Sequence, residues 1–441
     1  MVFTHPLEEE ITAEVVDKFI ELHKASLPRY LRLKELYESR GPILEQEAKA
    51  LDKPDNRLVV NNAKQLVDNY NGYFIGIPVK VSHENDKIND FIKDFRNRND
   101  MDDNESELSK ICALYGHGFE YIYQNEESET CCIYNNPLDM FIVYDDTIQQ
   151  NPLFAVRYYA TDDGIEGQLF TETEELAILS SGGETILTDS KPVYYNGVQV
   201  IEWIENEERM SVIEPVETLV NAYNKALSEK ANDVDYFADA YLALLGAELD
   251  EKGVAKIRDN RIINLFGTDD ASKIIVKFLD KPDGDATQEH LLDRIERLIY
   301  EKSMVANIND ESFGQASGVA LEFKLQPMKN LSINKERKVK SAMRRRFKLL
   351  FNLPTNVPAA LKDEWQNLEY KFTRNIPRNL SDEAETAAKL EGVVSKETQL
   401  GILSIVDNVK DEIGKMDKEN EPTNQYDFQI AETTEGVVAD E

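Results

Sequence analysis

The stretch SFGQASGVALEF, residues 312–323, gathers small and polar residues of the kind that form phosphate-binding loops. In a nucleotide-hydrolase loop these residues follow an apolar strand and end in Gly-Lys-Ser or Gly-Lys-Thr, and neither feature occurs here. A Gly-x-Ser-x-Gly nucleophile elbow is also absent from the sequence. The stretch therefore predicts neither nucleotide hydrolysis nor acyl transfer.

Histidine, cysteine and carboxylate residues show no spacing typical of a metal site. Cys112 and His117 make only a pair of ligands. The adjacent Cys131 and Cys132 suit neither a disulfide framework nor a tetrahedral metal site. With 83 Asp and Glu residues, carboxylate pairs are frequent and carry little information. We predict no catalytic residue, no metal and no cofactor, and the alternative is a metal-assisted hydrolase that uses clustered carboxylates.

The overall charge is strongly negative. The chain has 50 Lys and Arg residues against 83 Asp and Glu, a formal net charge of −33. Such an excess repels polyanions and disfavours ordinary tight nucleic-acid binding through counterion release. It fits either simple solubility or a surface that stays close to DNA without binding it firmly.

One basic segment departs from this pattern. KERKVKSAMRRRFK, residues 335–348, holds eight basic residues and one acidic residue, Glu336. Toward the end of a long helix these cations could complement the helix dipole and solvate one face. They could also contact DNA phosphates or acidic residues of a neighbouring subunit. The candidates for such contacts are Lys302, Lys335, Lys338, Arg345 and Arg346.

Hydrophobic periodicity predicts an α+β region up to about residue 212. Two short helices are expected within residues 10–40, and a helix over 61–71 should end at Gly72 and lead into a strand from Phe74 to Val81. A helical stretch follows over 86–115. Several runs rich in aromatic and β-branched residues then predict strands separated by turns.

The pattern becomes mainly helical after Glu214. Apolar residues at steps of three or four predict one helix from Val216 to Leu245, and a small insert with strand-like pieces precedes a second helix that begins near Asp285. A long helix from about Gly318 to Phe351 contains Pro327, which should kink or break it. A short strand is expected in LEYKFTRNIP, helices over 381–413, and an acidic, mobile tail from 414 onward.

No signal for membrane insertion or secretion is recognisable. No run of about 18 apolar residues occurs, and the N-terminus lacks the charged start and apolar middle of a signal peptide. We therefore expect synthesis in the cytoplasm and no membrane association.

Four segments, taken in order, resemble the portal proteins of tailed bacteriophages, in particular those of long-tailed phages of Gram-positive hosts. They are NNAKQLVDNYNGYFIGIPVKV, IYNNPLDMFIVYDDT with the following PLFAVRYY, EPVETLVNAYNKALSEKANDVDYFADAYL, and NIPRNLSDEAETAAKLEGVVSKETQL. Each motif is weak by itself, and their shared order gives the resemblance its specificity.

This resemblance implies an α+β portal fold with a wing, a helical stem, a small α/β clip, a long kinked helix and a helical crown. The implied parts are the wing (1–212 and 352–378), the stem helices (213–241 and 284–303), the clip (242–283), the tunnel loop (304–317), the kinked helix (318–351), the crown (379–413) and an acidic, flexible tail (414–441).

The resemblance also implies a function without an active site. Portal proteins form rings, usually dodecamers, through which double-stranded DNA passes during packaging and ejection. The implied partners are further copies of the chain, the terminase large subunit, a head-completion or adaptor protein, the scaffold and the major capsid protein. The implied location is the portal vertex of the virion, reached from the host cytoplasm during assembly.

The glycine-rich stretch takes a new meaning within this resemblance. It becomes a loop that enters the channel, with Gly314 and Gly318 as hinges. Neutralising Asp310 and Glu311 is expected to impair DNA packaging or retention and to leave ring assembly intact. The tunnel-loop candidates are Asn307, Asn309, Asp310, Glu311, Ser312, Phe313, Gly314, Gln315, Ser317 and Gly318.

Overall fold

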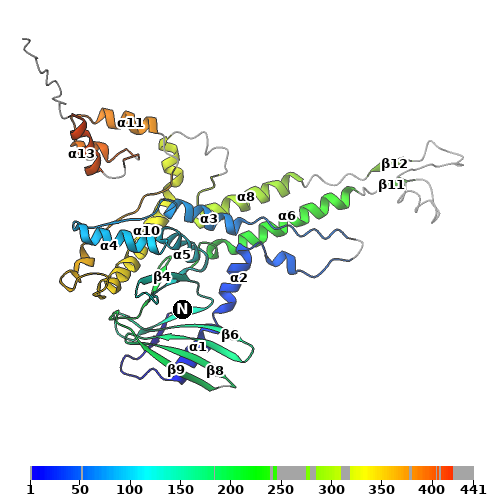
Figure 1. The fold of residues 1–441 in the computed structure, drawn as a ribbon. Coiled ribbons are helices and arrows are strands. Elements are labelled where there is room, and N and C mark those ends of the chain that lie inside the picture. The colour runs from blue at the N-terminus through cyan, green and yellow to red at the C-terminus, as the bar shows by residue number, and fades with distance from the viewer. Residues whose placement is uncertain are drawn as a thin grey trace, which may run out of the picture. The chain divides into compact units, whose positions relative to one another are not determined.

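The chain forms two compact units, Met1–Asn375 and Ile376–Glu441. The computed structural model in Figure 1 describes residues 2–50, 53–182, 184–238, 242–245, 275–278, 285–308, 318–376, 380–403, 405–406 and 409–420. Nine of the ten predicted tunnel-loop and hinge positions fall on residues 309–318, of which 309–317 lie outside these described residues, as does most of the predicted clip. No helix in the described ranges is long and apolar enough to cross a membrane.

Helices make up most of the first unit outside its sheets. Several begin at side-chain caps: Thr12, Asn61 and Asn85 each accept a hydrogen bond from a backbone N–H of the first turn. The helices of this unit are α1 (Ala13–Lys24), α2 (Leu27–Tyr37), α3 (Asn62–Ile75), α4 (Asp86–Arg98), α5 (Met101–Tyr115), α6 (Glu217–Ala238), α8 (Asp285–Ser303) and α10 (Gly318–Phe351), with the short 3-10 helices η1 (Pro42–Glu45), η2 (Glu214–Val216), η4 (Ala359–Leu361) and η5 (Glu364–Asn367).

The strands found in the described ranges of the first unit form four sheets. Their orders are β1-β5-β6-β7-β8-β9, β10-β3-β4, β11-β12 and β13-β2. Among the described pairings, β1 with β5 is parallel and the others are antiparallel. The strands are β1 (Phe3–His5), β2 (Lys80–Ser82), β3 (His117–Gln124), β4 (Thr130–Asn135), β5 (Met140–Asp145), β6 (Pro152–Thr161), β7 (Gly164–Phe170), β8 (Glu174–Ser181), β9 (Glu184–Pro192), β10 (Val200–Ile204), β11 (Leu242–Leu245), β12 (Ile275–Phe278) and β13 (Glu369–Lys371).

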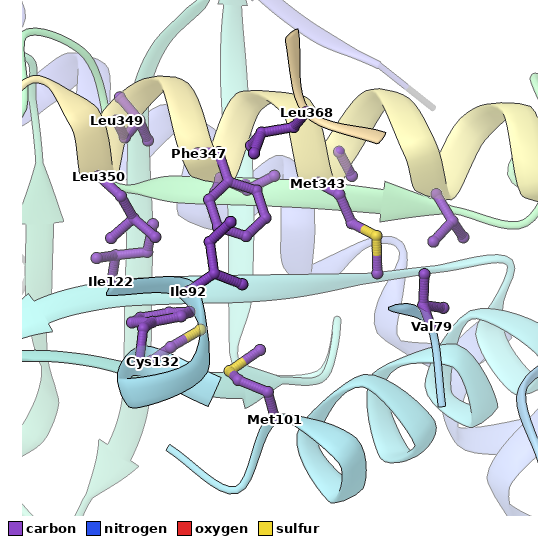
Figure 2. Close-up of a cluster of buried hydrophobic side chains, with 14 of the residues drawn as sticks. Val79, Ile92, Met101, Ile122, Cys132, Met343, Phe347, Leu349, Leu350 and Leu368 are labelled. Carbon is purple, nitrogen blue, oxygen red and sulfur yellow. The ribbon is translucent and has the colours of Figure 1, made fainter. Parts of the chain in front are cut away.

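Among the residues that the structure describes, three hydrophobic clusters hold this unit together. In the first, α1 covers one face of the six-stranded sheet with Val16, Phe19 and Ile20. A smaller cluster, which includes Phe119 and Phe170, joins the six-stranded and three-stranded sheets. The largest cluster buries the C-terminal half of α10 against α3, α4, α5 and the three-stranded sheet, as Figure 2 shows for Met343, Phe347 and Leu350. The long helix is therefore a core element as well as a candidate channel element.

The described part of the second unit contains three short helices. They are α11 (Leu380–Lys389), α12 (Lys396–Leu400) and α13 (Val409–Asn420). The side chain of Ser395 caps α12 by accepting from the N–H of Thr398, and Gln399 donates to the carbonyl of Ala387 in α11. Helices were expected over 381–413, but the predicted start of the tail at residue 414 is wrong, because α13 continues to Asn420. Val409, Ile413 and Met416 recur at helical spacing and are partly buried, which explains the longer helix.

Most predicted elements of the first unit are present, with four corrections. The strand expected from Phe74 is wrong at its start, since Phe74 and Tyr70 lie one turn apart on the buried face of α3, which continues past Gly72 to Ile75; only the end of the expected strand lies in β2. The helix expected to reach Leu245 ends at Ala238 as described, and Leu242–Leu245 is strand β11. Strand β9, which carries few apolar residues, was not expected. The long helix is continuous through Pro327, so a break there is wrong.

Candidate channel elements and the buried charges behind them

The two predicted stem helices pack against each other in opposite directions, as the green ribbons of α6 and α8 show in Figure 1. At their outer ends Gln288 donates to Asp233 at 2.9 Å, and Lys230 pairs with Glu289. The side chains of Val220 in α6 and of Leu292 and Ile299 in α8 are buried. The two helices pack together because each has an apolar face, and that face would be exposed to water if the helix stood alone.

The stem pair is acidic on its exposed surface. Together α6 and α8 contain nine Asp and Glu residues against five Lys and Arg residues. The side chains of Glu289 and Glu301 are more than half exposed, and the cation Lys302 is exposed in the last turn of α8. A surface of this sign binds phosphate weakly, because like charges repel across a distance comparable to the Debye length.

Lys335 of α10 lies in the interior of the first unit. Its side chain is 0% exposed, and its ammonium group pairs with Glu205 at 2.7 Å and donates to the carbonyl of Ser109 at 2.9 Å. The rings of Tyr70 and Phe74 lie 5.0 Å from the same nitrogen. A cation held on all sides in this way does not reach DNA or another subunit.

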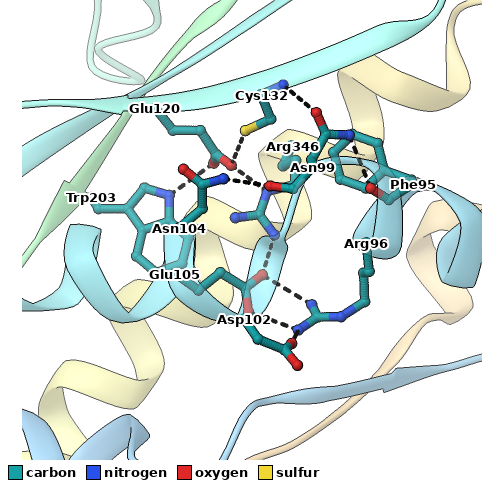
Figure 3. Close-up of polar contacts among 10 residues, drawn as sticks. All are labelled: Phe95, Arg96, Asn99, Asp102, Asn104, Glu105, Glu120, Cys132, Trp203 and Arg346. Carbon is teal, nitrogen blue, oxygen red and sulfur yellow. Dashed lines mark hydrogen bonds and ion pairs between the residues drawn. The ribbon is translucent and has the colours of Figure 1, made fainter.

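Arg346 is also buried, at the centre of the polar network in Figure 3. Its Nη1 lies 2.5 Å from Glu105 Oε1, and its Nε lies 2.6 Å from Glu120 Oε1. Trp203 stacks near the guanidinium at 5.3 Å and donates its indole N–H to Glu120. Arg96 supplies further bonds to Glu105.

These contacts keep the network charged despite its burial. Burial by itself would lower the pKa of Arg346, but the adjacent carboxylates of Glu120 and Glu105 raise that pKa above its ordinary value. Since removing one partner would leave a buried charge without compensation, the network fixes α10 against α5, β3 and β10. Its role is to position the helix.

The prediction that Lys335 and Arg346 contact DNA or a neighbouring subunit is therefore wrong. Their spacing already carried a signal, because Lys335, Val339, Ala342 and Arg346 recur at steps of four, three and four, and all four are buried. The two cations thus lie on the apolar face of α10. Their partners, Glu105, Glu120 and Glu205, are far away in the sequence and had no recognisable signature.

Other basic residues of the 335–348 run are more exposed than Lys335 and Arg346. Lys338 is about one third exposed and pairs with Glu207. Arg345 is partly buried, its Nε makes no hydrogen bond among the described residues, and burial lowers its pKa. Arg337, Arg344 and Lys348 are exposed and, in the part of the chain that the structure describes, form no ion pair; we call these three residues the exposed basic stripe.

A second buried network lies where β10, β3 and α2 meet. Glu202 accepts two bonds from Arg209, at 2.6 and 2.7 Å, and a third from His117 at 2.7 Å. Burial would raise the pKa of Glu202, but the bonds from Arg209 and His117 hold it far below its usual range. Sequence reasoning missed this network, which secures the three-stranded sheet beside the start of the stem.

Little of the predicted tunnel loop is described. Asn307 follows α8, is partly buried and donates to Glu296 at 3.5 Å. Gly318 is the first residue of α10. Asn309, Asp310, Glu311, Ser312, Phe313, Gly314, Gln315 and Ser317 lie outside the described residues.

Comparison with known families decides what these elements belong to. The family model described as "Phage portal protein, SPP1 Gp6-like" matches residues 16–426. The chain belongs to this portal protein family. The predicted α+β portal fold and the predicted family are thus confirmed, and the protein is a structural component of the portal vertex.

Individual relatives agree with this assignment. The portal protein of Bacillus phage SPP1 is 24% identical over 416 residues, which cover 88% of this chain and 80% of the relative. The portal protein of Clostridium phage phiCD119 is 20% identical over 431 residues, covering 90% and 94%. Phages of these two genera fit the predicted branch, and the hydrolase alternative finds no support.

Solved structures with a similar chain trace include a chain in the neck of a native gene transfer agent particle, computed with C12 symmetry. It aligns with a TM-score of 0.49 and 11% identity, and the alignment covers 86% of this portal protein and 94% of that chain. A chain in the virion of the same kind of particle aligns with a TM-score of 0.46 and 10% identity, covering 87% and 92%.

Proposed function

We propose that this portal protein assembles into a dodecameric ring and that double-stranded DNA passes through the ring during packaging and ejection. The order of elements carries the proposal: an antiparallel stem pair, α6 and α8, separated by an insert with the β11-β12 sheet and followed by the long helix α10. This order lies entirely within the residues matched by the family. The acidic stem surface supports the passage of DNA, because it offers phosphate no strong binding site.

Ring assembly is tested by the size and shape of the purified full-length chain. Mass photometry and negative-stain microscopy are expected to show ring-shaped particles with about twelve copies, as the family resemblance implies. A chain that stays monomeric over the salt and concentration ranges that promote assembly would contradict the proposal. Rings with a different number of subunits would contradict only the proposed stoichiometry.

We propose further that residues 304–317 contact DNA in the channel. The double substitution Asp310→Asn with Glu311→Gln should impair packaging or retention of DNA in assembled particles, while rings still form. Glu8→Gln with Glu9→Gln makes the same charge change at exposed positions near β1 and is the matched control. Normal packaging and retention with both loop residues replaced would overturn this role.

Since Lys335 and Arg346 are buried, the proposed contacts of basic residues are limited to side chains that are at least partly exposed. We propose the exposed basic stripe together with Lys302, Lys338 and Arg345 as contacts to DNA or to an acidic face of the neighbouring subunit. Reversing the stripe with Arg337→Glu, Arg344→Glu and Lys348→Glu should reduce ring yield or DNA packaging without unfolding the chain. Unchanged assembly and packaging would show that the stripe is only solvated surface.

The partner proposals follow from the family. The terminase large subunit is proposed to dock on the clip during packaging, and a head-completion or adaptor protein takes its place afterwards. Scaffold and major capsid protein are the proposed partners during assembly, which takes place in the host cytoplasm. Pull-down of purified rings with each protein is the direct test, and rings that lack residues 246–282 should lose the terminase while a shortened C-terminus should not.

A further inference from the structure

Residues 56–60 lie along α6 and are held there through their backbone. The N–H groups of alternate residues donate to three side chains of α6 that lie one turn apart. The bonds join Asn56 to Asn232 Oδ1 at 2.6 Å, Leu58 to Ser228 Oγ at 2.9 Å and Val60 to Asn224 Oδ1 at 2.9 Å.

The spacing of the two partners explains this register. Four residues of an α-helix advance by about 6.0 Å, and two residues of an extended chain advance by about 6.6 Å. Acceptors at every fourth helical position therefore match donors at every second extended position. The segment and the helix run in opposite directions, since the acceptor number falls as the donor number rises.

The contact recognises mainly main chain, since the one side chain of the segment that bonds to α6 within the described ranges is that of Asn56, which donates to Asp235. Leu58 and Val60 are 40% and 37% exposed, whereas Asn224, Ser228 and Asn232 are 2%, 1% and 6% exposed. Because the buried groups on α6 are polar, leaving them open to water costs less than exposing an apolar core. The arrangement can therefore open locally while the rest of the unit stays folded.

The C-terminal end of the segment is fastened to other elements, and the chain before its N-terminal end is fastened to α6 itself. Asn61, directly after it, caps α3 and donates to the carbonyl of Tyr37 at 2.7 Å and to Ser39 Oγ at 2.6 Å, at the end of α2. On the other side Lys49 pairs with Glu229 of α6 at 2.7 Å. The segment thus connects α6 to α2 and α3.

We infer that residues 56–60 are a releasable strap on the stem helix. While the strap is seated, it adds a second link between α6 and the helices α2 and α3, beside the ion pair of Arg32 in α2 with Glu217 in α6 at 2.7 Å; when it opens, that ion pair and the hydrophobic clusters remain. The Asn224–Ser228–Asn232 row is the seat, and its ligand is an extended polypeptide backbone, supplied by this chain's own residues 56–60. This inference does not depend on the proposed passage of DNA.

Hydrogen exchange of the full-length chain tests the seat. The amides of residues 56, 58 and 60 should exchange slowly, and those of Arg57 and Val59, which make no backbone or side-chain bond among the described residues, should exchange fast. Asn224→Ala, Ser228→Ala and Asn232→Ala together should speed exchange of the three protected amides at least about tenfold. Amides inside α6 should keep their rates.

Two matched variants separate the seat from general stability. Asn224→Asp with Asn232→Asp retains the accepting oxygens and should keep the protection, and Lys225→Ala changes an exposed residue of the same helix. Equal exchange in the alanine variant and in wild type would overturn the inference. Uniformly faster amide exchange throughout α6 would also overturn the inference, because the three side chains would then stabilise only the helix itself.

A disulfide tests which chain supplies the strap. Asn56 Nδ2 lies 2.5 Å from Asp235 Oδ2, so Asn56→Cys with Asp235→Cys should oxidise within one chain, in a Cys131→Ser background. The pair Asn56→Cys with Val234→Cys places the second thiol on a different side of α6 and should cross-link poorly. Disulfide-linked dimers as the main product would overturn the assignment of the strap to its own chain.

Discussion

Two buried acids, Glu105 and Glu120, hold Arg346 in the interior of the first unit. The sequence alone did not predict this pairing. A basic run in an acidic protein suggests surface contacts, yet Arg346 of that run is buried and pairs with two buried carboxylates. The helical spacing of Arg346 with Val339 and Ala342 could have placed it on the buried face. The identity of its partners depends on how β3 and α5 pack, which no local pattern encodes.

Replacing Arg346 should destabilise the first unit strongly. Arg346→Met leaves the buried carboxylates without a counter-charge, and we expect a loss of about 3–5 kcal/mol in the free energy of unfolding. Urea-induced unfolding measures this. Arg344→Met, an exposed neighbour, should change stability by no more than about 0.5 kcal/mol. If both variants lost a similar amount of unfolding free energy, the assigned role of the network would be contradicted.

His23 makes the unit sensitive to acid. Its Nε2 donates to the carbonyl of Pro137 at 2.9 Å and its Nδ1 accepts from the Tyr158 hydroxyl at 2.8 Å, so the neutral ring is fully bonded. Burial lowers the pKa of His23 from 6.5 to about 4. Because the unfolded chain takes up the proton first, stability is complete above pH 6.5 and falls as the pH drops toward 4.

The expected loss through His23 between pH 7 and pH 4 is about 3 kcal/mol. His23→Gln cannot titrate, so the difference in unfolding free energy between wild type and this variant should shrink by that amount over the same range. His290→Gln, at an exposed position, serves as the control. If both variants keep the pH slope of the wild type, His23 does not carry this effect.

At the scale of elements, periodicity identified most helices and failed where two interpretations of one apolar run competed. Phe74 and Ile75 have strand-forming character, but Tyr70 and Phe74 are one turn apart and both buried, so packing favoured the helix α3. The reverse happened at Leu242–Leu245, where pairing with β12 replaced a continued helix. In both places the partner element decided, and a single segment does not contain its partner.

Pro327 sets a weak point in α10. Proline lacks an N–H, so the carbonyl of Phe323 loses its helical partner, and the ring disfavours a straight helix. Pro327→Ala should stabilise this part of α10 by up to about 3 kcal/mol and slow the hydrogen exchange of nearby amides. Lys329→Ala, at an exposed position, is the control. Unchanged or faster exchange in the alanine variant would contradict the weak point.

At the scale of the whole molecule, the division at Asn375 predicts independent folding of the first unit. A chain that ends at Asn375 should unfold with the same main transition as the full-length protein, measured by calorimetry. A chain that ends at Phe351 is the contrast, because it lacks Leu353, Val357 and Leu368 of the largest hydrophobic cluster. A lowered transition temperature in the first truncation would show that the units stabilise each other.

The long-range contacts of the first unit also fix the order of events during protein synthesis. Arg346 is bonded to Glu105 across 241 positions, and β13 pairs with β2 from the beginning of the chain. A ribosome therefore releases the complete stem pair before the residues that close the body around it have been made. The body around the stem pair therefore closes late in synthesis, only after strand β13 has been made.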